Sequence, residues 1–327
     1  MINTVELLEQ LKNKRKTLLD EIHKLIVGQD RVIDNLLIGL FSNGHMLIEG
    51  VPGLAKTMLV STIAKALNLS FHRIQFTPDL MPSDITGSDI LNIGEQRTGS
   101  HYQFIKGPVF ANIILADEIN RTPPKTQAAL LQAMQEYQVT YGNQTWQLDL
   151  PFIVLATQNP IEQEGTYPLP EAQLDRFMFY INIGYPTLDE EKNIVVTTSG
   201  NIHPVIQPVM NASELIDFQT AIRDIPVSQH VIDFAVNLVR ATRPNQAPKE
   251  EYIDKWVNWG AGPRASQFLI LAAKARAALG GRLTPAEEDV IQVAEIVLQH
   301  RILVSFAAEA EGITSKDIVQ YLLHRPV

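Results

Sequence analysis

The sequence predicts an α/β domain built on a parallel sheet, followed by a smaller all-helical domain, and three observations lead to this prediction. Up to about Tyr185, short apolar runs alternate with helical patterns, which is typical of parallel strands covered by helices on both faces. After Pro186 the strand signals fade and helical patterns dominate. A glycine-containing loop follows the first predicted strand, where α/β folds commonly bind phosphate. We therefore expect the two domains to be residues 1–185 and 186–327.

The strands of the α/β domain are expected at five short apolar runs. These are His45–Ile48, Phe71–Phe76, Asn112–Ala116, Phe152–Ala156 and Phe177–Ile183. The spacing of apolar residues predicts helices over Thr57–Leu67 and Lys125–Tyr137. An amphipathic helix is also expected near the N-terminus, where leucine and isoleucine recur at helical spacing from Leu8 to Leu25. Together these elements predict an αβα core.

Helices make up the predicted second domain. They are expected at Ala212–Ile225, Val227–Thr242, Arg264–Leu279 and Thr284–Val304. The last of these begins with Thr284, Pro285, Ala286 and Glu287, which reads as a capping box with proline at the first helical position. We therefore expect that helix to start directly after Thr284.

Composition limits the classes of function that are open to the chain. Its 327 residues are 45% hydrophobic and 19% charged, which is ordinary for a globular protein and excludes disorder. The absence of cysteine excludes disulfides, thiolate metal sites and a cysteine nucleophile. A net charge of −9 disfavours non-specific binding to nucleic acid or to anionic membranes. No apolar run approaches the roughly 18 residues that span a bilayer, so we expect a cytoplasmic protein without direct membrane insertion.

The loop after the first strand carries the residues of a phosphate-binding site. It reads Gly50-Val51-Pro52-Gly53-Leu54-Ala55-Lys56-Thr57, and a predicted helix follows. Glycines let successive N–H groups point at one anion, and the helix N-terminus adds its positive dipole. Lys56 can reach the β- and γ-phosphates, and the Thr57 hydroxyl can bind Mg²⁺. The P-loop pattern has glycine where this chain has Ala55, and the alternative is a glycine turn into a helix with a surface lysine.

Two carboxylates, Asp117 and Glu118, end the apolar run Ile113–Ala116. The carboxyl ends of parallel strands face the crevice where open α/β sheets bind their ligands. Asp117 is expected to hold Mg²⁺ through water, and Glu118 to orient or deprotonate the attacking water. Many strands finish in an acidic turn, but this pair together with the phosphate loop predicts a nucleoside triphosphatase.

Three further polar residues have both a functional and a plain structural interpretation. Asn159, after the run Phe152–Ala156, could hydrogen-bond the γ-phosphate or the attacking water, or could form an Asn-Pro turn. Arg176 could stabilise a transferring phosphoryl group in a neighbouring subunit, or could pair with Asp175. Arg264 opens a predicted helix, where a cation opposes the helix dipole, and this favours a role facing a ligand over simple decoration of the first turn.

Together these segments resemble the AAA+ ATPases, which are P-loop NTPases, and within them the MoxR family. The resemblance covers nearly the whole chain and is densest at Leu115–Glu136 and Ala156–Phe177. It implies that the chain binds ATP and Mg²⁺, with Thr57 and Asp117 as the metal ligands. By resemblance, the phosphate loop and a short adenine-side motif that bind the nucleotide comprise Gly50, Val51, Pro52, Gly53, Leu54, Ala55, Lys56, Thr57, Met58, Val27, Gly28 and Gln29.

The resemblance also implies a role for each remaining candidate. Asp117 and Glu118 are similar to the Walker B carboxylates. Asn159 is similar to the first sensor, Arg176 to the arginine finger, and Arg264 to the second sensor, which the lid carries and which reports the nucleotide state to it. We therefore expect ATP between the core and the lid. The residues expected in catalysis are Glu118, Lys56, Asn159, Arg176 and Arg264.

Two predicted hairpins match insertions that are typical of this family. Asp89–Lys106 contains two alternating runs about the turn 97–100, which reads Arg-Thr-Gly-Ser, and Val139–Leu148 turns at Gly142 and Asn143. By resemblance, such hairpins face the central pore of a ring, expected to be a hexamer, and couple hydrolysis to work on a partner. The resemblance further implies a partner protein with a von Willebrand factor type A domain.

Charge near the second hairpin favours protein over nucleic acid as the substrate. Residues 126–175 contain no Lys or Arg, whereas a hairpin that follows a phosphate backbone needs cations at its tip. We therefore expect protein clients, no nucleic acid, and a chaperone-like role in the maturation or assembly of a protein or complex. One alternative is a helicase-like motor, since Tyr141 or Trp146 could stack on bases. The other is a switch in which ATP binding alone controls assembly.

Overall fold

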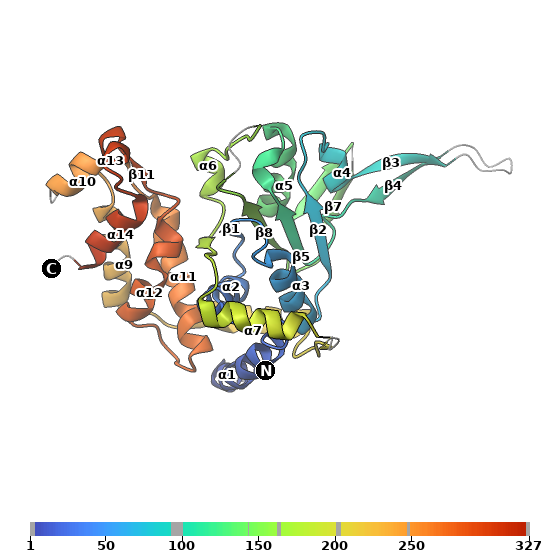
Figure 1. The fold of residues 1–327 in the computed structure, drawn as a ribbon, viewed down its shortest axis with the longest axis horizontal. Coiled ribbons are helices and arrows are strands. Elements are labelled where there is room, and N and C mark those ends of the chain that lie inside the picture. Colours follow the sequence, from blue (N-terminus) through green and yellow to red (C-terminus); the bar gives the residue numbers. More distant parts are fainter. Residues whose placement is uncertain are drawn as a thin grey trace.

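The computed structural model describes residues 4–92, 101–142, 144–161, 165–200, 204–246 and 249–324. Figure 1 shows an α/β part and, beside it, a part made mainly of helices from the C-terminal region of the chain. This arrangement confirms the predicted α/β core and helical lid. Among the residues described, no helix is both long enough and apolar enough to cross a membrane.

A five-stranded parallel sheet forms the centre of the α/β part. Its strands are β1 (Met46–Glu49), β2 (Phe71–Gln75), β5 (Ile113–Asp117), β8 (Ile153–Gln158) and β9 (Phe179–Asn182). Their order across the sheet is β2-β5-β8-β1-β9, and every pairing is parallel. All five fall on the predicted apolar runs. Because the strands are parallel, the carboxyl ends of β1, β5 and β8 meet at one edge of the sheet.

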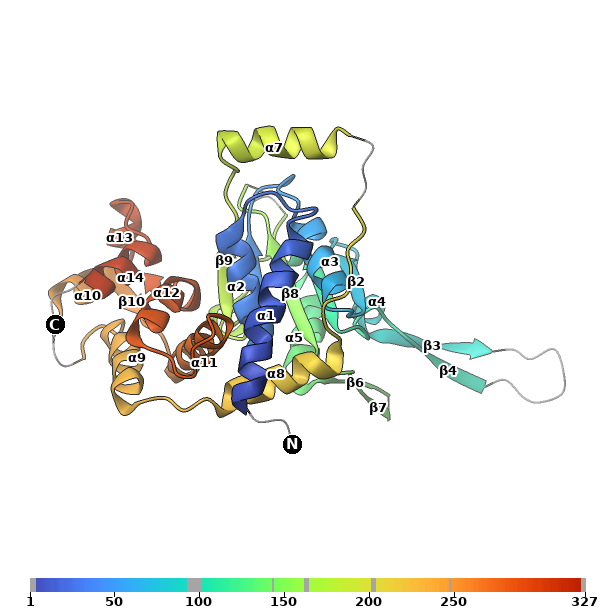
Figure 2. The same cartoon turned by 90° about the horizontal axis from the view of Figure 1, so that it is seen from below.

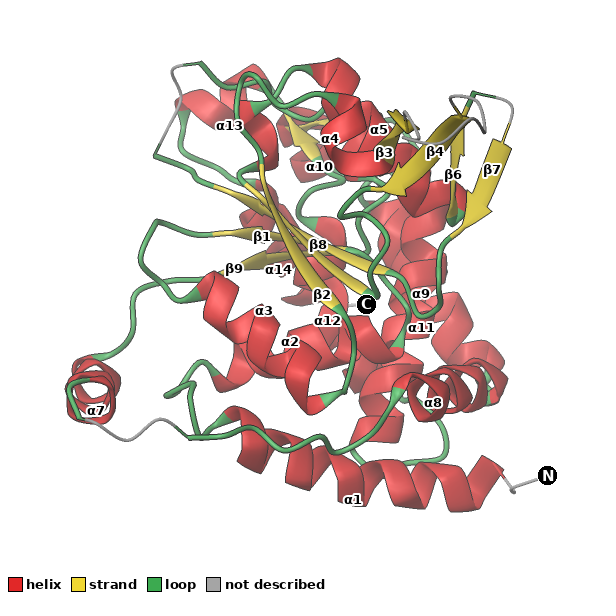
Figure 3. Cartoon of the chain, turned by 90° about the vertical axis from the view of Figure 1, so that its right-hand side faces the viewer, coloured by secondary structure: helices red, strands yellow, loops and turns green. Residues whose placement is uncertain are grey.

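Both faces of the inner strands β1, β5 and β8 are buried, which explains why these strands read as apolar runs, whereas the edge strand β2 exposes His72 and Arg73. Alternate residues enter two separate hydrophobic cores, as the period of two along a strand requires. One core contains Ile113 and Leu115 together with residues of α2 (Asp30–Phe41) and α3 (Lys56–Ala66). The other contains Ile114 and Ala116 together with residues of α5 (Pro124–Glu136). Figure 3 shows α2 and α3 on one side of the sheet and α5 on the other.

Further helices surround the α/β part. The predicted N-terminal helix is confirmed as α1 (Thr4–Ile22), which buries Leu8, Leu11, Leu18 and Ile22. The shorter elements are α4 (Pro82–Thr86), the 3₁₀ turn η1 (Ile119–Arg121), α6 (Glu171–Leu174) and α7 (Leu188–Thr198). The helix α7 stands away from the body of the core in Figure 2.

Seven helices and one strand pair follow α7 in the described part of the chain. The helices are α8 (Ala212–Asp224), α9 (Gln229–Ala241), α10 (Glu251–Trp256), α11 (Pro263–Leu279), α12 (Glu287–Leu298), α13 (Phe306–Ala310) and α14 (Ser315–His324). The lid is thus helical as predicted, and it also contains a short antiparallel pair, β10 (Val257–Trp259) with β11 (Leu303–Val304). The helix α8 packs against both α1 and α11 and so joins the two parts.

The prediction for residues 284–304 is wrong in two respects. The helix begins at Glu287 rather than after Thr284, because the Asp289 carboxylate accepts the Ala286 N–H at 2.9 Å and caps the helix there. The helix also ends at Leu298, and the chain then turns into β11. Polar side chains in this turn bond to the backbone of the core; the Gln299 side-chain amide, for example, donates to the Tyr180 carbonyl at 2.5 Å.

Both predicted hairpins are present, and aromatic side chains join them. One consists of β3 (Gly87–Asn92) and β4 (His101–Lys106), the other of β6 (Gln138–Tyr141) and β7 (Gln144–Gln147). The first projects from the core in Figure 2. Phe104 of β4 stacks on Trp146 of β7 with ring centroids 4.0 Å apart, and the Tyr141 ring lies 5.7 Å from Phe104. The predicted tip at 97–100 and the turn residue Asn143 lie outside the described residues.

Candidate functional site

The predicted phosphate loop connects β1 to α3. The backbone is left-handed at Gly53 (φ 85°) and at Ala55 (φ 55°), so the chain reverses twice before the helix begins at Lys56. Ala55 adopts this conformation at the position where the usual pattern has glycine. Gly50 has a different constraint: a Cβ there would lie 3.0 Å from the Ile183 carbonyl oxygen, so only glycine fits without a shift. The loop thus presents the free N–H groups at the start of α3 to an anion.

The Lys56 side chain folds back into this loop. Its amine donates to the Gly50 carbonyl and, at 3.5 Å, to that of Val51. Burial lowers the pKa of this amine, and the negative charges of Asp117, Glu118 and Glu49 act against that shift. The structure therefore brings Lys56 close to the two carboxylates at the end of β5, as the sequence predicted.

Asp117 is nearly buried, and neighbouring strands hold both of its carboxylate oxygens. One oxygen accepts the Thr157 hydroxyl at 2.5 Å, and the other accepts the Arg73 Nε and Nη2 at 2.9 and 2.6 Å. Arg73 lies on β2 and Thr157 on β8, the strands that flank β5. The carboxylate is therefore fixed in direction before any ligand binds.

Glu118 leaves the sheet in a left-handed conformation (φ 58°), which turns its side chain away from the strand direction. One of its carboxylate oxygens accepts the Gln75 amide at 2.9 Å and the Arg121 guanidinium at 3.0 Å. Its backbone N–H donates to the Thr157 hydroxyl at 2.9 Å, so one buried hydroxyl bonds to both Asp117 and Glu118. The left-handed conformation is strained for a residue other than glycine, and such strained residues are often found at functional sites.

The residues that support this pair were not predicted from the sequence. Thr157 precedes the amide-rich stretch Gln158-Asn159, and Arg73 and Gln75 alternate with apolar residues within the β2 run. Their position as polar side chains inside predicted strands was the feature of the sequence that could have indicated a supporting role. Their partners depend on the order of strands in the sheet, which the sequence alone does not give.

Asn159 follows β8 and lies at the same edge, with 5% of its surface exposed. Its side-chain oxygen accepts the Ile161 N–H at 3.2 Å and closes an Asn-Pro turn. The plain structural interpretation of this residue therefore holds in the structure. Asn159 could still bind a ligand at this edge while it forms the turn, because the turn uses only its side-chain oxygen and leaves the amide NH₂ free of that bond.

The adenine-side motif Val27-Gly28-Gln29 forms the turn before α2. Gly28 and Gln29 are both left-handed, with φ of 65° and 56°. A Cβ at Gly28 would lie 1.9 Å from a carboxylate oxygen of Glu190, which also accepts the Gln29 N–H at 3.3 Å. The first turn of α7 thus rests on this motif, and only glycine leaves room for the contact.

Arg176 and Arg264 do not join this cluster. Arg176 precedes β9, whose Phe179 lies opposite Met46 at the start of β1, so Arg176 lies beyond the amino end of the sheet and Lys56 at the carboxyl end. The two ends of β1, Met46 and Glu49, are three residues and therefore about 10 Å apart along the strand. The Arg264 guanidinium pairs with Asp175 at 2.8 Å. The lid arginine therefore lies with the residue next to Arg176, and not with the phosphate loop of its own chain.

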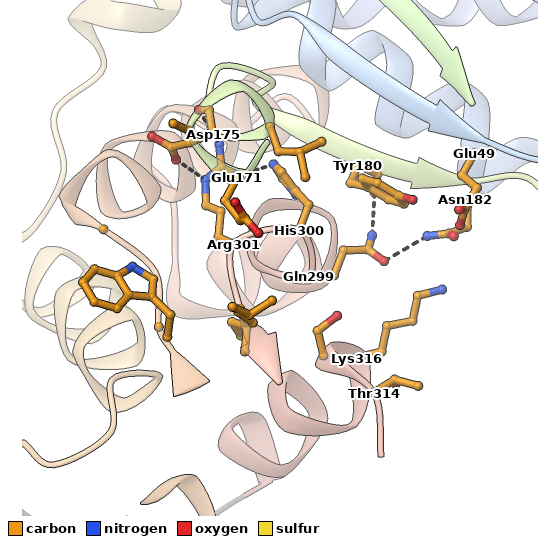
Figure 4. A pocket seen from close by; sticks show the side chains of 18 residues that line it. Glu49, Glu171, Asp175, Tyr180, Asn182, Gln299, His300, Arg301, Thr314 and Lys316 are labelled. Carbon is orange, nitrogen blue, oxygen red and sulfur yellow. Dashed lines mark hydrogen bonds and ion pairs between the residues drawn. The ribbon is translucent and has the colours of Figure 1, made fainter. Parts of the chain in front are cut away.

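A cleft of about 1060 Å³ lies between the lid and the β9 edge of the core. Figure 4 shows Asp175 and Arg301 at one end and Glu49 and Asn182 at the other. The Tyr180 phenol faces it, and burial together with the charge of Glu49 raises the pKa of that phenol. The cleft connects the neighbourhood of the phosphate loop with the cluster around Asp175.

The candidate site fits a magnesium-bound nucleotide. Within the described ranges, no group of three or more His, Asp or Glu side chains could hold a metal ion without other ligands. Asp117 and the Thr57 hydroxyl instead offer two hard oxygens at the phosphate loop. Mg²⁺ prefers this small donor set, because it keeps several waters and takes its other ligands from substrate phosphates.

Comparison with known proteins places the chain in a family. The signature of the ATPase family associated with various cellular activities (AAA) matches residues 45–179, and that of the AAA lid domain matches residues 249–322. The chain is 43% identical to the chaperone MoxR1 of Mycobacterium tuberculosis, over 93% of this chain and 79% of that protein. It is 32% identical to protein MoxR of Methylorubrum extorquens, over 86% and 85%. The crystal structure of a protein from Cytophaga hutchinsonii matches with a TM-score of 0.90 and 44% identity, over 98% and 97% of the two chains.

Proposed function

Since this chain belongs to the MoxR family of AAA+ ATPases, we propose that it uses ATP hydrolysis to remodel protein clients during the maturation or assembly of a protein or complex. The ATPase activity follows from the family. The kind of client and the residue roles below are inferred from the geometry and the charges of the site.

The carboxyl edge of the sheet supplies the groups that phosphoryl transfer to water needs. The phosphate loop and the 27–29 turn would hold the nucleotide, with the Lys56 amine exchanging loop carbonyls for phosphate oxygens. Thr57 and Asp117 would hold Mg²⁺, which supplies charge neutralisation on the phosphates when bound. Glu118 takes a proton from the attacking water, and the free amide NH₂ of Asn159 orients that water or the γ-phosphate.

We assign Arg176 and Arg264 to the nucleotide of a neighbouring subunit. Both lie at the amino end of the sheet, on the far side from Lys56 of the same chain. None of the residues that the structure describes forms an ion pair or hydrogen bond with the Arg176 guanidinium, so this charge is available to a partner. A ring, which we expect to be a hexamer, brings this face of one subunit against the phosphate loop of the next.

Protein is the client that the hairpins favour. The aromatic residues that could have stacked on bases, Tyr141 and Trp146, pack against Phe104. Residues 126–175 contribute no cation that could follow a phosphate backbone. A partner with a von Willebrand factor type A domain would serve as an adaptor, and we place this work in the cytoplasm, where ATP is available.

The client class can be tested with the Glu118→Gln variant, which should bind ATP without hydrolysing it and so hold its client. We expect this variant to retain protein from lysate in an ATP-dependent, nuclease-resistant complex. The matched control is Glu136→Gln, the same change at an exposed carboxylate on α5, which should retain nothing. Recovery of a nuclease-sensitive, salt-sensitive DNA complex, together with DNA-stimulated hydrolysis by the wild type, would overturn the assignment to protein.

A further inference from the structure

One buried arginine of the lid holds the core segment that carries Arg176. Arg301 lies in the turn after α12, and only 2% of its side chain is exposed. Its Nη2 donates to the carbonyls of Asp175 and Phe177 at 3.1 and 2.6 Å, and its Nη1 to that of Met178 at 3.3 Å. A single guanidinium thus bonds to the backbone on both sides of Arg176.

The same guanidinium also pairs with a side chain of this segment. Arg301 Nε donates to one oxygen of the Asp175 carboxylate at 2.8 Å, and Arg264 donates to the other oxygen at the same distance. Asp175 therefore joins two lid arginines, one at the start of α11 and one after α12. Figure 4 shows the pairing of Asp175 with Arg301 at the end of the cleft.

Burying the Arg301 guanidinium carries a desolvation cost that its partners must offset. A buried guanidinium needs nearly all of its donors satisfied. Here Asp175 and three carbonyls of the core supply most of the acceptors, and the Val297 carbonyl and the His300 ring of the lid supply the others. The core carbonyls that Arg301 binds are those of residues 175, 177 and 178. We call these bonds, together with the Arg301–Asp175 ion pair, the clamp, and they fix the position of the Arg176 backbone. The Arg176 side chain itself stays free of the clamp.

We propose that Asp175 and Arg301 are positioning residues, which hold Arg176 of the core and Arg264 of the lid together as one unit that faces a neighbouring subunit's nucleotide. This inference rests on the proposed role of Arg176 in the neighbouring site. It predicts that losing the Asp175 carboxylate harms the donor face of a subunit and leaves that subunit's own phosphate loop competent.

Subunit mixing separates these two faces. Asp175→Asn keeps the shape of the side chain and removes the charge that both arginines share. Alone, this variant should lose at least about tenfold in kcat, with the KM for ATP changed less than about threefold. Mixed with Lys56→Ala, whose donor face is intact, it should regain turnover, because about a quarter of randomly formed interfaces then combine an intact phosphate loop with an intact donor face.

Two controls make the outcome decisive. Glu171→Gln removes a carboxylate on α6, in the same segment, and should leave turnover unchanged. The pair Arg176→Ala with Lys56→Ala tests the proposed role of Arg176 itself, so that its failure to regain turnover would indicate an error in the proposed function. Regained turnover for that pair, but not for Asp175→Asn with Lys56→Ala, would overturn the present inference, as would full activity of Asp175→Asn alone. Asp175→Glu, which displaces the carboxylate by one methylene, undergoes the same mixing if Asp175→Asn does not fold.

Discussion

The Arg264 guanidinium lies 2.8 Å from the carboxylate of Asp175, which is the residue directly before Arg176. An arginine of the lid thus contacts the core segment that carries Arg176, at the opposite end of the sheet from Lys56. Under the proposed function, one chain would hold two half-sites: the phosphate loop with its carboxylates on one face, and two arginines on another. Each would be completed by a different neighbour.

The Thr157 hydroxyl should determine the geometry of both carboxylates at the end of β5. Thr157→Val keeps the shape of the side chain but leaves the Asp117 oxygen and the Glu118 N–H without a partner. We expect the free energy of unfolding to fall by about 1–3 kcal/mol, since the Asp117 oxygen is buried and the Glu118 N–H is half-buried, and kcat to fall at least about tenfold. Urea unfolding and steady-state hydrolysis measure the two effects. Thr157→Ser, which keeps the hydroxyl, should retain most of both; equal losses in the two variants would indicate that the methyl group matters instead.

His45 should make the fold sensitive to acid. Its Nδ1 accepts the Val154 N–H at 3.0 Å, so Nε2 carries the proton and donates to the Met134 carbonyl at 3.1 Å. Burial lowers the pKa of this ring from 6.5 to about 4. Between these values the unfolded chain binds a proton that the native protein does not, so stability falls as the pH drops from about 6.5 toward 4.

The size of this effect can be measured by difference. His45 should account for a loss of about 3 kcal/mol over that pH range, from the 1.36 kcal/mol that each pKa unit represents. Urea unfolding at several pH values should show a weaker pH dependence for His45→Gln than for the wild type. His230→Gln, at a histidine whose side chain is 80% exposed, is the control and should follow the wild type. The same slope in His45→Gln and the wild type would show that the ring is not held neutral.

Phe104 should couple the two hairpins. Phe104→Ala removes the stack on Trp146 and the contact with Tyr141. Each aromatic pair of this kind contributes roughly 0.5–1.5 kcal/mol. We expect faster amide exchange in β6 and β7 and a red-shifted Trp146 emission, with basal ATP turnover unchanged. Phe306→Ala, at a ring that is 83% exposed on the lid, should change none of these. Unaltered exchange in β6 and β7 would mean that the hairpins are positioned independently.

The centre of the sheet was predictable from the sequence because the inner strands β1, β5 and β8 are buried on both faces and therefore appear as apolar runs. The phosphate loop and the pair Asp117-Glu118 were predictable for a related reason, since they lie within a few residues of those runs. Contacts between distant segments were not. The bonds of Thr157 to Asp117, and of Arg301 to the segment around Asp175, depend on strand order and on where the lid docks. The end of α12 was misjudged for the same reason, because the turn after it is stabilised by the core and not by local propensity.

The most direct test of this account is the fate of ATP on the Glu118→Gln variant. Because this change removes the proposed base but keeps the side-chain shape, turnover should fall by about 10²–10⁴-fold, while the Kd for ATP and ATP-dependent assembly stay near those of the wild type. Glu136→Gln, measured in parallel, should hydrolyse ATP normally. Undiminished hydrolysis by Glu118→Gln would contradict the assignment of the hydrolytic site. Full biological activity with hydrolysis abolished would show instead that the protein is a switch operated by ATP binding.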